Sequence, residues 1–161
     1  LMVPYFKVLS GKSDITIAAR NISERGPGLE GNYRKLHGDL SNIDFLYFHS
    51  DKEYKELYSD QKDKRWAFKY TDKYQLNENV KVEVDWSKAS DSLVLRDISG
   101  EITSIGSERE QYLNQNISIT GEFKNLILKI EQEKNQSLNP LLTNGYEKSP
   151  SVDLSLSLIH I

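Results

Sequence analysis

VKVEVDW, residues 80–86, is the most regular alternation of apolar and charged side chains in this chain. Successive side chains of a strand point to opposite faces, so this stretch predicts a β-strand with one apolar and one polar face. A second alternating run, from Trp66 to Tyr70, precedes it, and the polar residues 71–79 between the two runs are typical of a connection. Together the runs predict an antiparallel hairpin with a rather long loop.

Further strand and turn signals lie on both sides of this hairpin. Residues 15–19 alternate like a half-buried strand, whereas residues 43–48 are apolar on both faces, so we expect this second strand to be covered on both sides. Pro27 and Gly28 suit the central positions of a type II turn. From Glu131 the chain becomes polar, which predicts a loop or the lead-in to further elements.

One short helix is predicted near residues 51–60. Ser50 and Glu53 have the spacing of a capping box, in which each side chain bonds a free backbone N–H of the first helical turn. Tyr54 and Leu57 begin an apolar stripe at helical spacing on an otherwise charged segment. We therefore expect a surface helix of two to three turns.

A short phrase occurs twice, as ISGEI at residues 98–102 and as ITGEF at residues 119–123. Leu93 and Leu95 are expected to begin the strand that leads into the first copy. Glycine inside a strand usually marks a bend or a bulge, so we expect both phrases at bends of neighbouring strands, with their large apolar residues on the apolar face. The apolar phase then changes at 124–125, which requires a turn or a bulge.

The composition excludes several classes of protein. The chain of 161 residues has a net charge of -3, and its basic residues form no stripe with interleaved aromatic residues, so we expect no nucleic-acid partner. The absence of cysteine excludes disulfides, thiol catalysis and zinc–thiolate sites. No stretch reaches the ~20 apolar residues of a membrane-spanning helix, so we expect membrane contact only through parts of the protein outside this sequence.

Both ends of the sequence suggest a fragment. The chain begins at Leu1 rather than at methionine, and residues 156–161 match the translation of a transposase adapter used to prepare sequencing libraries. We therefore expect 156–161 to be an artefact of assembly from environmental DNA, to be left out of fold reasoning. Residues 1–155 then form a single β-rich domain or a fragment of a longer protein built from repeats.

Two groups of polar residues have the side chains that a metal site or an acid–base pair would need. The histidine and carboxylate residues that lie near one another in sequence are His37, Asp39, Asp44 and His49, and their spacing matches no metal-ligand motif. Glu83 and Asp85 share the polar face of the best strand, but Lys81 beside them indicates a solvated surface rather than an acid–base pair. We therefore predict no enzymatic activity, no metal and no cofactor.

The pattern of strands resembles the AsmA-like superfamily of bacterial envelope proteins, which includes the YhdP and TamB branches. The resemblance rests on residues 125–128, on the two glycine phrases, and on residues 84–86 followed by 93–95. It implies a periplasmic, non-enzymatic protein whose antiparallel strands form a curved open sheet or groove, similar to a β-taco, that carries phospholipid acyl chains. The groove lining that it implies here comprises Val80, Val82, Val84, Leu93, Leu95, Ile98, Ile102, Ile119, Phe123 and Leu128.

A closed β-sandwich is the alternative fold, and a ligand-binding module, with carbohydrate as an example of its ligand, is the alternative function. Trp66, Phe68 and Tyr70 lie in one phase of a strand and could form an aromatic platform for sugar rings. The same row is also typical of the core face of a strand.

Overall fold

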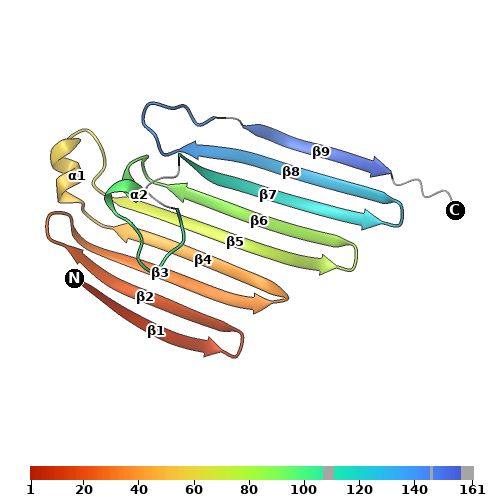
Figure 1. The fold of residues 1–161 in the computed structure, drawn as a ribbon, viewed down its shortest axis with the longest axis horizontal. Coiled ribbons are helices and arrows are strands. Elements are labelled where there is room, and N and C mark those ends of the chain that lie inside the picture. The colour runs from red at the N-terminus through yellow and green to blue at the C-terminus, as the bar shows by residue number, and fades with distance from the viewer. Residues whose placement is uncertain (107–110, 146, 157–161) are drawn as a thin grey trace.

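The computed structural model describes residues 1–106, 111–145 and 147–156, so only Leu156 of the expected artefact falls within it. The described residues form one antiparallel sheet of nine strands in which each strand pairs with the next along the chain (Figure 1). Two short helices, α1 (Lys52–Leu57) and α2 (Val94–Asp97), lie in the connections. The strands are β1 (Met2–Ser10), β2 (Ser13–Ile22), β3 (Gly26–His37), β4 (Asp39–Phe48), β5 (Arg65–Asn77), β6 (Val80–Ala89), β7 (Tyr112–Phe123), β8 (Leu126–Ser137) and β9 (Lys148–Leu156). The predicted mainly β fold with an open antiparallel sheet is therefore confirmed, and the alternative closed sandwich does not form.

The two ends of the sheet differ in their connections (Figure 1). At one end, which we call the tight-turn end, the strands are joined by one or two residues, at positions 11–12, 38, 78–79 and 124–125. At the opposite, long-connection end, residues 49–64 carry α1 and residues 90–111 carry α2. The predicted hairpin is confirmed as β5 and β6, but the strands extend through most of its expected loop and leave a turn of two residues.

The buried core lies on one side of the sheet only. The connection between β6 and β7 crosses over β3 to β5 (Figure 1) and buries its apolar side chains against them. This cluster joins Leu46, Phe48, Ala67 and Ala89 of the strands to Val94, Leu95, Ile98 and Ile105 of the connection. Burial of apolar surface is the main favourable term in folding, so this connection is part of the packed structure rather than a solvated loop.

The strand predicted to begin at Leu93 and Leu95 is wrong. Val94, Leu95 and Ile98 are almost completely buried, and their spacing of i, i+1 and i+4 is helical, so the segment forms α2 and places these three side chains together. Leu93 and Leu95 have the i, i+2 spacing of a strand face, but the apolar Val94 between them breaks the alternation. The first glycine phrase consequently lies in an irregular connection and not in the sheet.

The bend predicted at the second glycine phrase is also wrong. Gly121 pairs regularly with Val80 on one side and with Leu128 on the other, without a bulge. A Cβ atom at Gly121 would lie 2.8 Å from the ring of Phe123, so the glycine makes room for this ring rather than bending the strand. The phase change at 124–125 is confirmed as the tight turn between β7 and β8.

Three smaller expectations were wrong for similar reasons of packing. Pro27 and Gly28 lie inside β3, and the turn occupies the residues before Gly26. Position 28 is a glycine because a side chain there would collide with the ring of Phe48. The polar residues after Glu131 continue β8 and are followed by β9. One face of β4 is exposed rather than covered.

The helix predicted near residues 51–60 is confirmed as α1, but its six residues make fewer than the two to three turns expected. Its cap is Asp51 rather than Ser50, since the carboxylate of Asp51 accepts a hydrogen bond from the backbone N–H of Tyr54. Within the described residues, no helix is both long enough and apolar enough to cross a membrane.

Candidate functional site

The register of the strands assembles one face of the sheet from apolar residues. Directly opposed residues of neighbouring strands project to the same face, and one such row runs Tyr74, Val82, Ile119, Ile130, Val152 across five strands. These side chains do not form a core, since Ile119 is 41% exposed and Val152 is 65% exposed. A row of exposed aliphatic groups in register is unusual for a face in contact with water.

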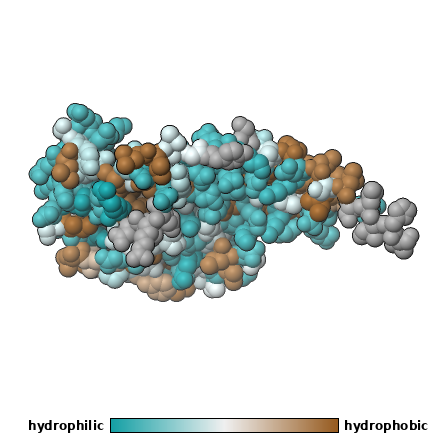
Figure 2. Space-filling model, turned by 45° about the horizontal axis from the view of Figure 1, so that its top comes forward, coloured by the Kyte–Doolittle hydropathy of each residue, from teal (hydrophilic) through white to brown (hydrophobic). Residues whose placement is uncertain are grey.

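We call this surface the apolar face, and it extends over all nine strands. The exposed fraction differs from one of its side chains to the next. In every strand, the alternate residues that oppose one another in the register form this face. The opposite side of the sheet, which we call the polar face, is the one turned to the viewer over much of Figure 2, where hydrophilic side chains prevail. The apolar face comprises Val3, Tyr5, Ile15, Ile17, Leu29, Tyr33, Ile43, Phe45, Tyr47, Trp66, Phe68, Tyr70, Tyr74, Val80, Val82, Val84, Trp86, Ile117, Ile119, Phe123, Leu126, Leu128, Ile130, Val152, Leu154 and Leu156.

The structure divides the predicted groove lining into two groups. Those that lie on the apolar face are Val80, Val82, Val84, Ile119, Phe123 and Leu128. Those that lie elsewhere are Leu93, Leu95, Ile98 and Ile102, because the connection that carries them packs on the other side of the sheet. The first group remains a predicted contact surface, and the second group does not share its surface.

The aromatic row predicted as an alternative platform also belongs to the apolar face. Trp66 and Phe68 stack with their ring centroids 6.0 Å apart. Tyr47 of β4 lies directly opposite Trp66, and Phe45 lies opposite Phe68, so the aromatic rings continue into the neighbouring strand. The row is therefore one part of a larger apolar surface rather than a separate platform among polar residues.

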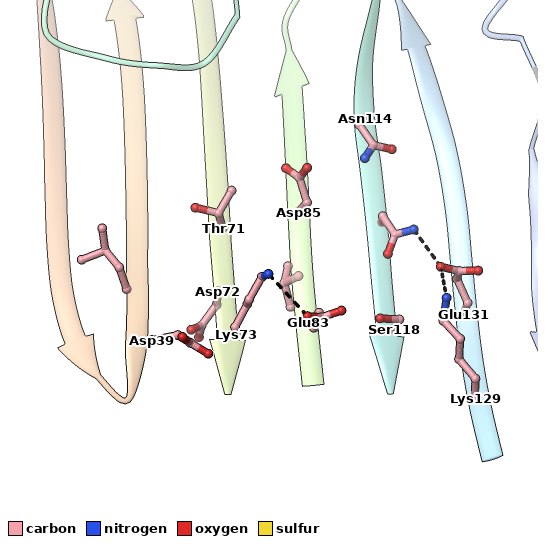
Figure 3. Close-up of a pocket in the computed structure, with 13 residues that line it drawn as sticks. Asp39, Thr71, Asp72, Lys73, Glu83, Asp85, Asn114, Ser118, Lys129 and Glu131 are labelled. Atoms are coloured by element: carbon pink, nitrogen blue, oxygen red, sulfur yellow. Dashed lines mark hydrogen bonds and ion pairs between the residues drawn. The ribbon is translucent and has the colours of Figure 1, made fainter. Parts of the chain in front are cut away.

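The polar face has a hollow of about 500 Å³ over β5 to β8 (Figure 3). Its walls carry carboxylates, amides, hydroxyls and lysines. They include Asp39, Thr71, Lys73, Glu83, Asp85, Asn114, Asn116, Ser118, Lys129 and Glu131. Hydrogen bonds from Lys129 at 2.9 Å and from Asn116 at 3.2 Å lower the pKa of Glu131 to about 2. This surface is therefore strongly hydrated and carries permanent charge.

Glu83 and Asp85 lie in this hollow without the features of an acid–base pair. The ammonium of Lys81, 2.8 Å from the carboxylate of Glu83, donates a hydrogen bond and lowers the pKa of that carboxylate. A general acid in glycoside hydrolysis needs the opposite shift, toward a raised pKa. The geometry agrees with the solvated surface that the sequence indicates.

The candidate histidine and carboxylate cluster does not converge. His37 contacts Ser41 and lies 3.1 Å from Asp72, whereas Asp44 accepts hydrogen bonds from Asn32, Asn42 and Ser104 elsewhere in the sheet. His49 shares a hydrogen bond of 3.1 Å with the phenol of Tyr47. Over residues 1–106, 111–145 and 147–156, no group of three or more such side chains could hold a metal ion.

Two buried charged clusters were not predicted from the sequence. Arg65 is fully buried and bonds to Asp51, Asp91 and Asp97. Glu30 is also fully buried and pairs with Arg20 at a distance of 3.0 Å. Nothing in the sequence distinguishes these residues from the many solvated charges around them, because their burial depends on the connection that covers them.

No family model matches this chain, but it is similar to several curated proteins described as LPS-assembly protein LptD. It is 24% identical to the protein of Ectopseudomonas mendocina over 155 residues, which are 96% of this chain and 16% of that protein. It is 24% identical to the Pseudomonas aeruginosa protein over 153 residues, 94% of this chain and 16% of the relative. It is 30% identical to the Pseudomonas savastanoi protein over 121 residues, 74% of this chain and 13% of the relative. The chain thus spans about a sixth of the length of these relatives.

These similarities support the expected cell-envelope context of the chain. The relatives are described as assembly proteins for a lipid of the cell envelope and not as enzymes, which agrees with an envelope context and with the predicted localisation in the periplasm or cell envelope. Membership of the AsmA-like superfamily finds no support among them. The similarity extends along nearly the whole sheet.

Proposed function

We propose that this chain is a non-enzymatic segment of an envelope protein for lipopolysaccharide transport, and that its apolar face contacts lipid acyl chains. The observation that carries the proposal is the extended apolar face, which all nine strands share, which Asp72, Lys88 and Gln132 interrupt, and which no described element covers. Exposed apolar surface of this extent marks a protein or membrane contact. The similarity to LPS-assembly proteins favours a lipid over a protein as the occupant.

The dimensions of the sheet suit this contact. The strands are 9 to 13 residues long, which corresponds to roughly 30 to 43 Å at about 3.3 Å per residue. The hydrocarbon core of a bilayer is about 30 Å thick, and strands of about 9 to 11 residues can span it when tilted. The apolar face is therefore long enough to lie against acyl chains over their full length, in place of the indirect membrane contact expected from the sequence.

The polar face provides for the other half of an amphiphilic lipid. Lipopolysaccharide joins acyl chains to a hydrated saccharide, and a sheet with one apolar and one hydrated face separates surfaces that suit these two parts. The hollow lined by Thr71, Asn114 and Asn116 offers amide and hydroxyl groups that can exchange hydrogen bonds with sugar hydroxyls. The proposal assigns acyl contact to the apolar face and hydrated groups to the polar face.

The two tryptophans provide an intrinsic test, because Trp66 and Trp86 are the only ones in the chain and both lie on the apolar face. The chain should be reconstituted with phospholipids brominated along their acyl chains, and separately with unbrominated lipids, before tryptophan fluorescence is recorded. Contact with acyl chains predicts strong quenching by the brominated lipid. A competing arm with added lipopolysaccharide tests whether this glycolipid displaces the brominated phospholipid.

A matched control moves the fluorophore to the opposite face. In the Trp66→Phe, Trp86→Phe background, a single Asn116→Trp substitution places the only tryptophan in the polar hollow, where brominated acyl chains should not quench it. Equal quenching from both faces, or no quenching of Trp66 and Trp86, would contradict the proposal.

A further inference from the structure

One buried carboxylate holds a long segment against the polar face. A single oxygen of Glu30, on β3, accepts hydrogen bonds from the backbone N–H groups of Glu101 (2.7 Å), Ile102 (2.8 Å) and Thr103 (3.1 Å), and from the hydroxyl of Thr103 (3.0 Å). Its second oxygen pairs with Arg20, which also donates to the carbonyl of Ser99. Successive N–H groups that converge in this way form an anion-binding nest, and here the anion is a side chain of the protein itself.

Residues 99–106, which we call the flap, have few other attachments. Within the described part of the chain, no backbone hydrogen bond connects the flap to the sheet or to α2. The remaining contacts are the hydroxyl of Ser104 with Asp44, the side chain of Glu101 with Arg20, and the burial of Ile105 in the core. Release of the flap would therefore leave every strand pairing in place.

The glycine of the first phrase finds its explanation in this attachment. A Cβ atom at Gly100 would collide with the hydroxyl of Thr103 and would lie 3.2 Å from the carboxylate of Glu30. Gly100 thus allows the backbone of the flap to approach the carboxylate closely enough for all three N–H groups to reach it. The phrase ISGEI thus supplies Gly100 and two of the three N–H groups of the nest, those of Glu101 and Ile102.

The root of the flap has an independent attachment. The N–H of Ile98 bonds to the carbonyl of Val94 within the last turn of α2, and Asp97 bonds to the buried Arg65. The flap can consequently change position without displacing α2. This separation between root and flap distinguishes a local opening from general unfolding.

We infer that the flap is a conformational device that closes over the polar face of β2 to β4 and is latched by the Glu30 carboxylate, which accepts four hydrogen bonds from it. The Glu30 carboxylate neutralises Arg20 and fills the nest, so the closed state depends on one negative charge at one position. An anion of similar size that enters the vacated position should replace the latch when the side chain is removed. The inference concerns the polar face and does not depend on what the apolar face contacts.

Hydrogen exchange of the purified chain measures the latch directly. Glu30→Ala should raise the exchange rate of the Glu101, Ile102 and Thr103 amides by about tenfold or more, because each loses a charge-assisted hydrogen bond. The amide of Ile98 and the strand amides should keep their rates. Added acetate should reverse most of the increase, whereas chloride at equal ionic strength should not.

Two further variants keep the test decisive. Glu101→Gln removes only the exposed ion pair with Arg20 and should leave exchange of the nest unchanged. Gly100→Ala retains Glu30 but forces the flap away from it, and should reproduce the local increase without rescue by acetate, even if Glu30→Ala fails to fold. Unchanged nest exchange in Gly100→Ala, or an equal increase in the strands, α2 and the flap, would overturn the inference.

Discussion

At the scale of single residues, Arg65 determines how the long connections are held. Its guanidinium lies 2.9 Å from Asp51 of the α1 cap, 2.8 Å from Asp91 and 3.1 Å from Asp97 beside α2. It also lies 4.0 Å from the centre of the Tyr54 ring, in cation–π geometry. A planar group with five donors can satisfy several carboxylates at once, so one side chain joins two connections that are distant in sequence.

We predict that Arg65→Gln lowers the free energy of unfolding by about 3 to 5 kcal/mol, because it removes the fully buried cation that Asp51, Asp91 and Asp97 share, while Arg25 and Arg96 still pair with Asp51 and Asp97. Urea denaturation followed by circular dichroism measures the change. Arg96→Gln, which removes an exposed guanidinium from the same Asp97, should change stability by less than about 0.5 kcal/mol. Equal effects of the two substitutions would show that burial of Arg65 is not important.

The same cluster predicts a loss of stability in acid. Burial alone would raise the pKa of Asp91, but hydrogen bonds from Arg65 and attraction to it outweigh burial and hold the pKa below the ordinary value of 3.8. A carboxylate with a lowered pKa in the folded state stabilises the fold above its unfolded pKa and loses this contribution as pH falls toward the folded pKa. Thermal melting should therefore show stability that declines below about pH 4, and Asp91→Asn should be less stable at neutral pH with a weaker dependence on acid.

At the scale of elements, the turn between β7 and β8 carries local strain. Lys124 has a φ of 52°, a left-handed conformation that costs a residue with a Cβ atom about 1 kcal/mol. The turn has only two residues and fixes the register of the twelve paired positions that follow. A one-residue slip in this register would move the apolar side chains of β8 to the polar face.

Lys124→Gly should stabilise the chain by about 0.5 to 1 kcal/mol, because glycine adopts a positive φ without the Cβ clash. The midpoint of urea unfolding reports the gain. Asn125→Gly is the matched control, since the φ of Asn125 is not positive and glycine there only adds freedom to the unfolded chain. A gain in both variants would point to a general effect of glycine in the turn instead of relief of strain at Lys124.

At the scale of the whole molecule, the sheet has two surfaces that serve different environments. The buried ion pairs, the core cluster and the flap all lie on the polar face, so the elements that stabilise the fold leave the apolar face free. The connections are also unequal, with tight turns at one end and both helices at the other (Figure 1). A molecule built in this way has one exposed apolar side and a defined end for its longer connections.

Because adjacent residues of β7 lie on different faces, substitution by lysine should impair liposome association at one of them and not at the other. Ile119→Lys places a charge among acyl chains, which costs about 2 to 4 kcal/mol near the middle of a bilayer, and should abolish stable association with liposomes in flotation experiments. Thr120→Lys projects to the polar face and should leave flotation unchanged. Similar behaviour of the two variants would contradict the assignment of the faces.

The sequence by itself determined the mainly β character of the chain, the hairpin around residues 80–86 and the separation of the hairpin's two faces. Alternation in Val80–Trp86 and the phase change at 124–125 are local properties of the chain, and a period of two residues leaves the strand few alternatives. The mistaken strand at Leu93 shows the limit of this reasoning, because Val94 and Leu95 become buried only when the connection folds back over β5.

Only the tertiary structure decided which face is covered and which charges are buried. Glu30 meets the N–H of Thr103 across 73 positions of sequence, and Arg65 meets Asp97 across 32. Local patterns carry no information about such encounters, since a carboxylate in a polar phase is equally compatible with water and with a nest of backbone N–H groups. The alternation fixed what each face is made of, and the fold-back of one connection fixed which face is packed and which is left exposed.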